Sequence, residues 1–135
     1  MFQLREPRER DLKRFLAAMA TSPLSYVDVG IASQSAPVGY RLDTAEVLLG
    51  TGEAAFRSAV MALQSWKMFD LGWVQAMPSA APIAPSVNVA VTVHHLGFWS
   101  LNGCRVVYIV PSTEGATERY GFAARRLPAY CAQRY

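Results

Sequence analysis

The chain has 135 residues, of which 52% are hydrophobic and 17% charged, and its formal net charge is +3. This composition excludes a disordered chain, and the length is that of a single domain, which we expect to span residues 1–135. No run of about eighteen apolar residues occurs, so we expect no membrane partner. No apolar segment follows the basic N-terminus as it does in a secretory signal, so we expect a cytoplasmic protein.

The first predicted element is a helix over residues 7–20. Pro7 suits the first turn of a helix, and Thr21-Ser22-Pro23 ends the pattern. An apolar stripe at helical spacing is made of Leu12, Phe15, Leu16 and Met19. Two strands are predicted next, over 24–29 and 40–49, and the strongest part of the second is Val47, Leu48 and Leu49.

A second helix is predicted from the turn Gly50-Thr51-Gly52 to about Phe69. Thr51 can cap the helix, and the carboxylate of Glu53 is favoured at its positive end. One apolar face is shared by Phe56, Ala59, Val60, Leu63 and Trp66.

The central feature of the sequence is a pair of strands within residues 87–110. Valine recurs at every second position over 87–93, which is the period of a strand, and a second β-rich run follows over 99–110. Further strands are predicted over 73–77 and 119–127. The resulting fold class is α+β: an antiparallel, curved sheet of about six strands with both helices on one face.

Several segments, in their order and spacing, resemble a family known only as a domain of unknown function. They are PLSYVDVG (23–30), GYR (39–41), LGTGEAAFRSAVMALQSWKMFDLGW (49–73), HHLGFWSLNGCRVVYIV (94–110) and RYGFAARRLP (119–128). The resemblance implies a fold similar to the helix-grip architecture of Bet v 1 and START domains, in which a sheet wraps a long C-terminal helix around a hydrophobic cavity. It implies no particular activity.

The family pattern continues with a further strand and a long final helix, so we expect a C-terminally shortened version here, since the sequence stops at Tyr135. The open face of the sheet is then covered by a second copy or by the N-terminal helix, or the cavity is damaged. The segment 124–126 replaces a Tyr-Gly-Thr-like stretch of the family and adds two arginines beside the implied cavity mouth.

Candidate chemical groups are few. His94 and His95 are neighbours in a strand and so point to opposite faces, which excludes both from one metal site, and we expect no metal or cofactor. His94 is a weak candidate for a general base; the alternative is a histidine satisfied by the backbone. Cys104 and Cys131 lack metal spacing, so we expect free thiols, with a structural disulfide as the alternative; Cys104 then acts as a small buried hydrophobe.

Polar residues set into the apolar sheet suggest a binding site. Strand alternation places Asn102 and Tyr108 on one face and Trp99 and Arg105 on the other. A buried Arg105 needs an anionic ligand or an acid, for which the candidates are Asp28, Asp43 and Glu46. The predicted ligand contacts are His94, Trp99, Asn102, Arg105, Tyr108 and Phe122, with Val91 as a further wall; the alternative is a structural hydrogen-bond network.

These features favour a domain that binds a small apolar molecule, with a simple acid–base step as an option. The alternative is a non-enzymatic module that pairs through its open sheet face with a second copy or another protein. Basic residues gather at both ends of the chain, but no nucleic-acid recognition motif is present, so nucleic acid is the least favoured partner.

Overall fold

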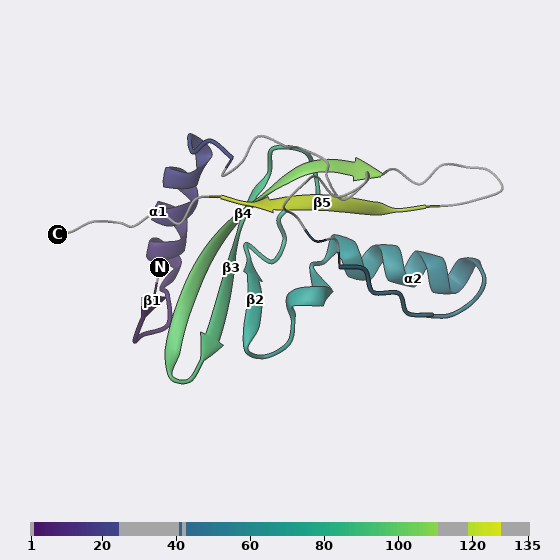
Figure 1. Cartoon of the computed structure of the whole chain (residues 1–135), viewed down its shortest axis with the longest axis horizontal. Coiled ribbons are helices and arrows are strands. Elements are labelled where there is room, and N and C mark those ends of the chain that lie inside the picture. Colours follow the sequence, from purple (N-terminus) through teal and green to yellow (C-terminus); the bar gives the residue numbers. More distant parts are fainter. Residues whose placement is uncertain (1, 25–40, 42, 111–118, 128–135) are drawn as a thin grey trace.

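One antiparallel sheet organises the computed structural model of the chain, which describes residues 2–24, 41, 43–110 and 119–127 (Figure 1). Its strands are β1 (Phe2–Gln3), β2 (Val74–Met77), β3 (Asn88–His95), β4 (Phe98–Val110) and β5 (Gly121–Arg126). The helices are α1 (Glu9–Ala20) and α2 (Glu53–Gln64), and a short 3₁₀ turn, η2 (Lys67–Phe69), follows α2. The fold is therefore α+β, with five strands in the part of the chain described.

Strand β4 is the longest strand and pairs along both of its edges. The sheet order is β1-β4-β3-β2, and β5 also pairs with β4. Since β1 pairs with Trp99 and Ser100 and β5 pairs with residues 104–110, β1 and β5 follow each other along the edge opposite β3. Between them, the Leu127 N–H donates to the Gly103 carbonyl at 2.8 Å, which continues the pairing along this edge.

Helix α1 covers one face of the sheet, here called the helix face. The register places Ala90 and Leu101 side by side on this face, where they form a buried cluster with Leu12 of α1. Met19 is fully buried against β4, and Gly103 provides the space: a Cβ atom there would lie 2.7 Å from the Met19 sulfur. The N-terminal helix thus packs directly on the central strands.

The opposite face, here called the loop face, is covered by the chain around Trp66 and residues 78–87. The buried cluster on this face comprises Trp66, Ala76, Ala81, Val89 and Val106. Trp66 lies just after α2 with φ of 57°, and its indole N–H donates to the Ala81 carbonyl at 2.7 Å. Its ring also meets that of Phe122 edge-on, with centroids 5.2 Å apart. The core therefore lies on both faces of the β3–β4 pair.

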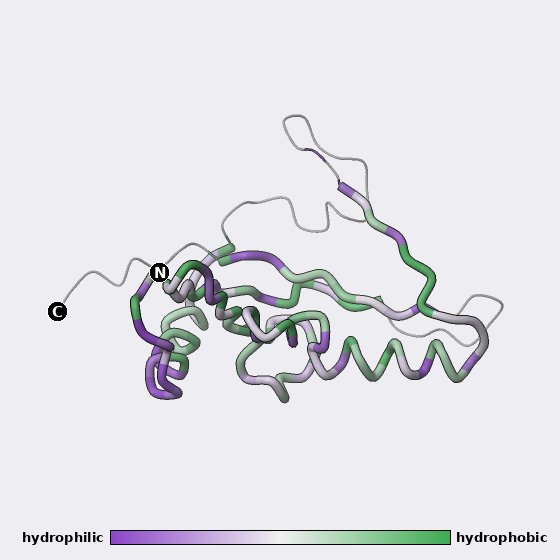
Figure 2. Tube along the Cα trace, turned by 90° about the horizontal axis from the view of Figure 1, so that it is seen from below, coloured by the Kyte–Doolittle hydropathy of each residue, from purple (hydrophilic) through white to green (hydrophobic). Residues whose placement is uncertain are grey.

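The strand expected in the segment before α2 is not formed. Residues 43–49 form no strand, and Val47, Leu48 and Leu49 are largely exposed. Figure 2 shows this hydrophobic stretch, coloured green, running outside the sheet before it enters α2. Its composition suits a strand, but a strand requires a hydrogen-bonding partner, and the described residues provide none.

Helix α2 is shorter than predicted and is less involved in the core. It ends at Gln64, because the chain turns at Trp66 into the left-handed region before η2. No residue of α2 is buried, whereas α1 buries Leu12 and Met19. Both helices were expected to cover one face of the sheet; in the described structure α1 covers it and α2 does not bury a residue. The strand expected over 24–29 lies outside the described residues, apart from Leu24, and Cys131 also lies outside them. We expected about six strands, and the described residues form five.

Candidate functional site

A β-bulge divides the predicted site residues between the two faces. In the β4–β5 ladder Val106 pairs with Ala124 and Tyr108 pairs with Ala123, so Val107 is an extra residue on β4. The extra residue moves Tyr108 away from the face that Asn102 occupies, contrary to the simple alternation predicted. The register places His94, Trp99, Arg105 and Tyr108 on the helix face and Asn102 and Phe122 on the loop face.

His94 and Trp99 form the closest aromatic pair among the predicted residues. They are register partners at the end of the β3–β4 hairpin, and their rings stack with centroids 4.5 Å apart and planes 18° apart. The His94 main-chain N–H donates to the Trp73 carbonyl at 2.7 Å. Within the described residues no carboxylate or hydroxyl bonds to the imidazole, so nothing there orients it as a general base.

Arg105 forms hydrogen bonds with an amide and with main-chain carbonyls, and not with the predicted acid. Its Nε donates to the Asn88 Oδ1 at 2.8 Å, and one Nη donates to the carbonyl oxygens of Met19 at 2.7 Å and Ala20 at 3.3 Å. These carbonyls end α1, where the helix dipole is negative, and the Met19 carbonyl also accepts from the Ser22 N–H at 3.1 Å. Of the candidate acids, Asp43 instead pairs with Arg41, and Asp28 lies outside the described residues. Arg105 is therefore engaged in structure.

Asn102 and Phe122 are also held by neighbours on the loop face. The Asn102 amide Nδ2 donates to the Ser100 hydroxyl at 3.3 Å, and its Oδ1 accepts from Arg126 at 2.9 Å. Phe122 packs on Trp66 in the core. In the described structure both side chains therefore contact other groups of the protein.

Cys104 lies partly buried beside the same core. Burial raises the pKa of the Cys104 thiol, and the nearby positive charge of Arg126 opposes this rise only in part. A raised pKa disfavours the reactive thiolate, which agrees with a packing role. Across the residues that the structure describes, no three His, Cys, Asp or Glu side chains gather as a metal site would require.

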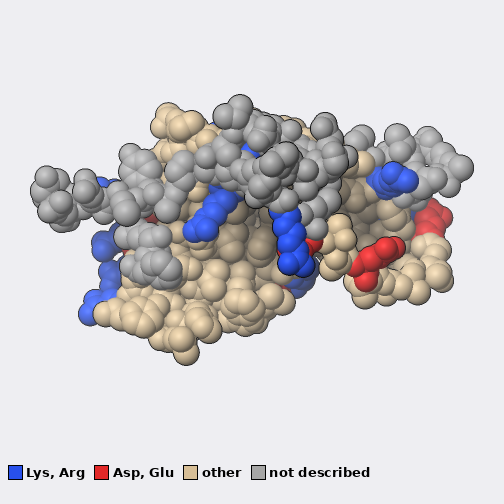
Figure 3. All heavy atoms as spheres, in the orientation of Figure 1, with Lys and Arg blue, Asp and Glu red and all other residues tan. Residues whose placement is uncertain are grey.

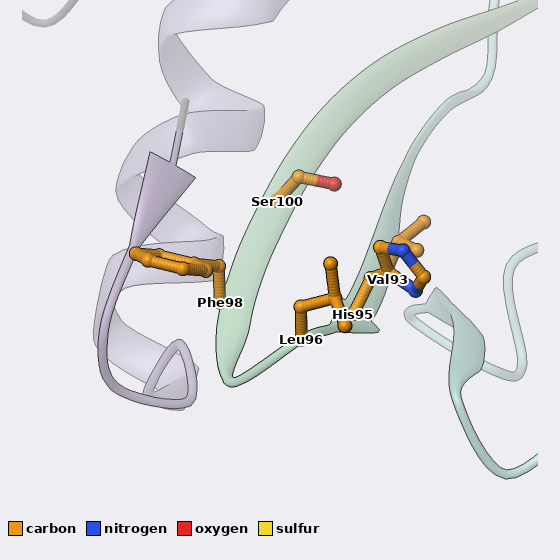
Figure 4. Close-up of a pocket in the computed structure, with 5 residues that line it drawn as sticks. All are labelled: Val93, His95, Leu96, Phe98 and Ser100. Atoms are coloured by element: carbon orange, nitrogen blue, oxygen red, sulfur yellow. The ribbon is translucent and has the colours of Figure 1, made fainter.

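A hollow lies on the loop face at the turn of the β3–β4 hairpin. Its volume is about 160 Å³, it opens to solvent, and it is lined by Val93, His95, Leu96, Phe98 and Ser100. Figure 4 shows Phe98 on one side of the hollow and Val93 and His95 on the other, with Leu96 at the turn and Ser100 further along β4. None of these five residues was among the predicted contacts.

The sequence of the β3–β4 turn is unusual and could have pointed to this site. His95 pairs with Phe98, so Leu96 and Gly97 form a two-residue turn, and their φ angles are 50° and 79°. Such turns favour Asn-Gly or Asp-Gly, because both central residues need positive φ. A leucine in the first position is unusual, and the side chain of Leu96 is 82% exposed.

Other exposed apolar side chains lie at the same end of the sheet. Leu4 follows β1 beside the start of β4, and Leu71 and Trp73 precede the β2 residue that pairs with Val93. We call this set the hairpin-end surface; it consists of Leu4, Leu71, Trp73, Leu96 and Phe98, each at least half exposed. Three segments distant in the sequence thus contribute to one apolar end.

Comparison with known sequences places the chain in a family. The model of the family described as "Domain of unknown function (DUF1990)" matches residues 25–133, so the chain belongs to this family. It is 28% identical over 134 residues to a UPF0548 protein of Dictyostelium discoideum, covering 91% of this chain and 62% of that protein. It is 30% identical over 71 residues to a UPF0548 protein of Arabidopsis thaliana, covering 53% of this chain and 34% of that protein.

The matched part of these relatives is limited, since the chain spans about three fifths of the Dictyostelium protein and one third of the Arabidopsis protein. No solved structure matches the chain, so the helix-grip resemblance has no structural counterpart to compare. Among the described helices, none has the length and apolar character needed to cross a membrane. Helix α1 precedes the family match, yet it packs on strands that lie inside it.

Proposed function

We propose that this domain is a binding module that accepts an apolar or amphipathic group at the hairpin-end surface. The observation that carries the proposal is the hollow, whose surface is almost wholly apolar and is formed by Val93, His95, Leu96, Phe98 and Ser100. Binding sites for small molecules are lined predominantly by hydrophobic side chains. The exposed apolar residues around the hollow extend this surface.

The size of the hollow restricts what it can hold. Sites that enclose a drug-sized molecule measure about 300–1,000 Å³, whereas this hollow is about 160 Å³ and open to solvent. It therefore suits one side chain, or a short alkyl or aryl group, with the rest of the bound molecule outside. We assign no catalytic step, because His94 stacks on Trp99 without an orienting acid among the described residues.

The test uses the amphipathic dye ANS, which fluoresces on apolar protein surface. We expect the dilute chain to bind ANS and Phe98→Ser to weaken binding about tenfold, since an apolar wall is lost. Leu48→Ser is the control, because Leu48 is also an exposed apolar residue, 81% against 50% for Phe98, but lies in the segment before α2. Equal binding by wild type and Phe98→Ser, or an equal loss in Leu48→Ser, would contradict the proposal.

A further inference from the structure

We infer that the apolar group bound at the hairpin-end surface is Leu96 of a second copy of this chain, bound reciprocally. The inference rests on the proposed function, because the hollow must accept an apolar group. Three observations support it: the conformation of Leu96, the position of the hollow next to it, and the charge around both.

Leu96 is unfavourable for the isolated fold in two respects. Its φ of 50° lies in the left-handed region, which costs an L-residue with a bulky side chain energy that Asn or Gly would avoid. Its side chain is also 82% exposed, so the fold gains almost nothing from its apolar area. A residue held in a sparsely populated conformation without benefit to folding suggests a role in function.

The hairpin offers both halves of a self-complementary contact. Leu96 projects at the turn, and the hollow beside it, between Phe98 and Val93, has room for one side chain (Figure 4). A twofold axis through this end would bring each copy's Leu96 to the other's hollow, as in isologous dimers, where one patch meets itself. Phe98, itself half exposed, would be buried at the centre of the contact.

The charge at this end favours another neutral surface. The hollow is lined by no Lys, Arg, Asp or Glu, and Lys67 near Leu71 pairs with Asp70 at 2.9 Å. Arg5 beside Leu4 is followed directly by Glu6. Figure 3 shows the lower end of the molecule as mainly tan, with blue side chains at its left margin on the side of α1 and others at its upper right margin. An anionic lipid surface or a nucleic acid would instead require a basic end.

The experiment is sedimentation velocity of the full chain from about 1 µM to about 500 µM, a range that resolves micromolar dimers. We expect a concentration-dependent dimer, with Leu96→Asn raising its Kd about 100-fold because two leucines lose their burial. Asparagine suits the left-handed turn, so this variant keeps its fold, which circular dichroism checks. Leu48→Asn, at an equally exposed leucine, should dimerise like wild type.

Two results would overturn the inference: a wild-type chain that stays monomeric throughout, or a dimer that Leu96→Asn leaves unchanged. Binding of monomers to anionic vesicles that depends on Leu96 would also overturn it, in favour of a lipid partner. If the chain stays monomeric but binds ANS, and Phe98→Ser weakens that binding, the inference of a second copy is wrong and the proposed function stands. If the chain neither dimerises nor binds ANS, both fail.

Discussion

The guanidinium of Arg105 donates to the carbonyl oxygen of Met19 at 2.7 Å and so joins the middle of β4 to the last turn of α1, 86 residues earlier in the chain. The same side chain reaches Ala20 and Asn88. A positive, planar donor is favoured at the negative end of a helix, where it adds a charged hydrogen bond to the one that the Met19 carbonyl accepts from the Ser22 N–H at 3.1 Å. This contact fixes α1 on the helix face.

Removing this contact should destabilise the domain. We expect Arg105→Ala to lower the free energy of unfolding by about 2–3 kcal/mol, because the hydrogen bonds from a charged group to Asn88 and to the end of α1 are lost. The free energy of unfolding of Arg105→Lys should lie between those of wild type and Arg105→Ala, since lysine keeps the charge but loses the forked geometry. Urea unfolding measures both. Arg57→Ala, which removes only an exposed ion pair with Glu53, should cost less than about 0.5 kcal/mol; an equal cost would contradict the structural role of Arg105.

The space above Gly103 gives a second prediction. A Cβ at this position would lie 2.7 Å from the Met19 sulfur, so Gly103→Ala should cost about 1–3 kcal/mol through overpacking. In a Met19→Ala background the same substitution should cost clearly less, because the obstructing side chain is gone. Gly121→Ala is the control, since nothing lies within 4 Å of its Cβ position. Identical costs of Gly103→Ala in both backgrounds would contradict this packing.

Leu96→Asn should stabilise the isolated monomer. Asparagine adopts φ near 50° more readily than leucine, so we expect a gain of about 1 kcal/mol, which corresponds to a rise of about 3–5 °C in Tm. Thermal unfolding at low concentration, where any dimer is dissociated, measures this gain. An unchanged or lower Tm would show that Leu96 contributes to the fold of the monomer.

The Cys104 thiol should produce a loss of stability at alkaline pH. Burial raises its pKa, with Arg126 opposing, so the folded state holds the proton more tightly than the unfolded state. The contribution is therefore complete below the unfolded pKa of about 8.5 and is lost as pH rises toward the folded pKa. Urea midpoints between pH 7 and pH 10 should fall more for the Cys131→Ser chain than for the same chain carrying Cys104→Ala. Parallel curves would contradict the prediction.

The sequence predicted the elements whose patterns are local. The alternating valines before His94 and the β-rich run after Phe98 produced a hairpin because each pattern contains its own period. The leucines at 47–49 show the converse, since their composition matched a strand but the partner strand is absent from the described fold. Composition near Trp66 likewise gave no indication that the chain would turn left-handed and end α2 early.

The candidate site was harder to predict, because its geometry depends on distant residues. The bulge at Val107 exchanges the faces of the residues that follow it, and nothing in the local sequence marks it. The partner of Arg105 is the main chain of α1, which carries no sequence signature, so an acid was expected instead. The unusual position of Leu96 could have been predicted from the sequence, since a leucine before glycine in a two-residue turn departs from the usual turn residues.

The placement of β1 and β5 along one edge of β4 has a consequence for how the chain avoids aggregation. Because β4 pairs with β3 over residues 98–105 on one edge and with β1 and β5 on the other, most of the strand with the most main-chain donors is closed to an incoming strand. The edge on the other side is β2, which has four residues and is followed at once by Pro78, a residue without an N–H to donate. Addition of a strand from another molecule at β2 or along the paired part of β4 is therefore restricted.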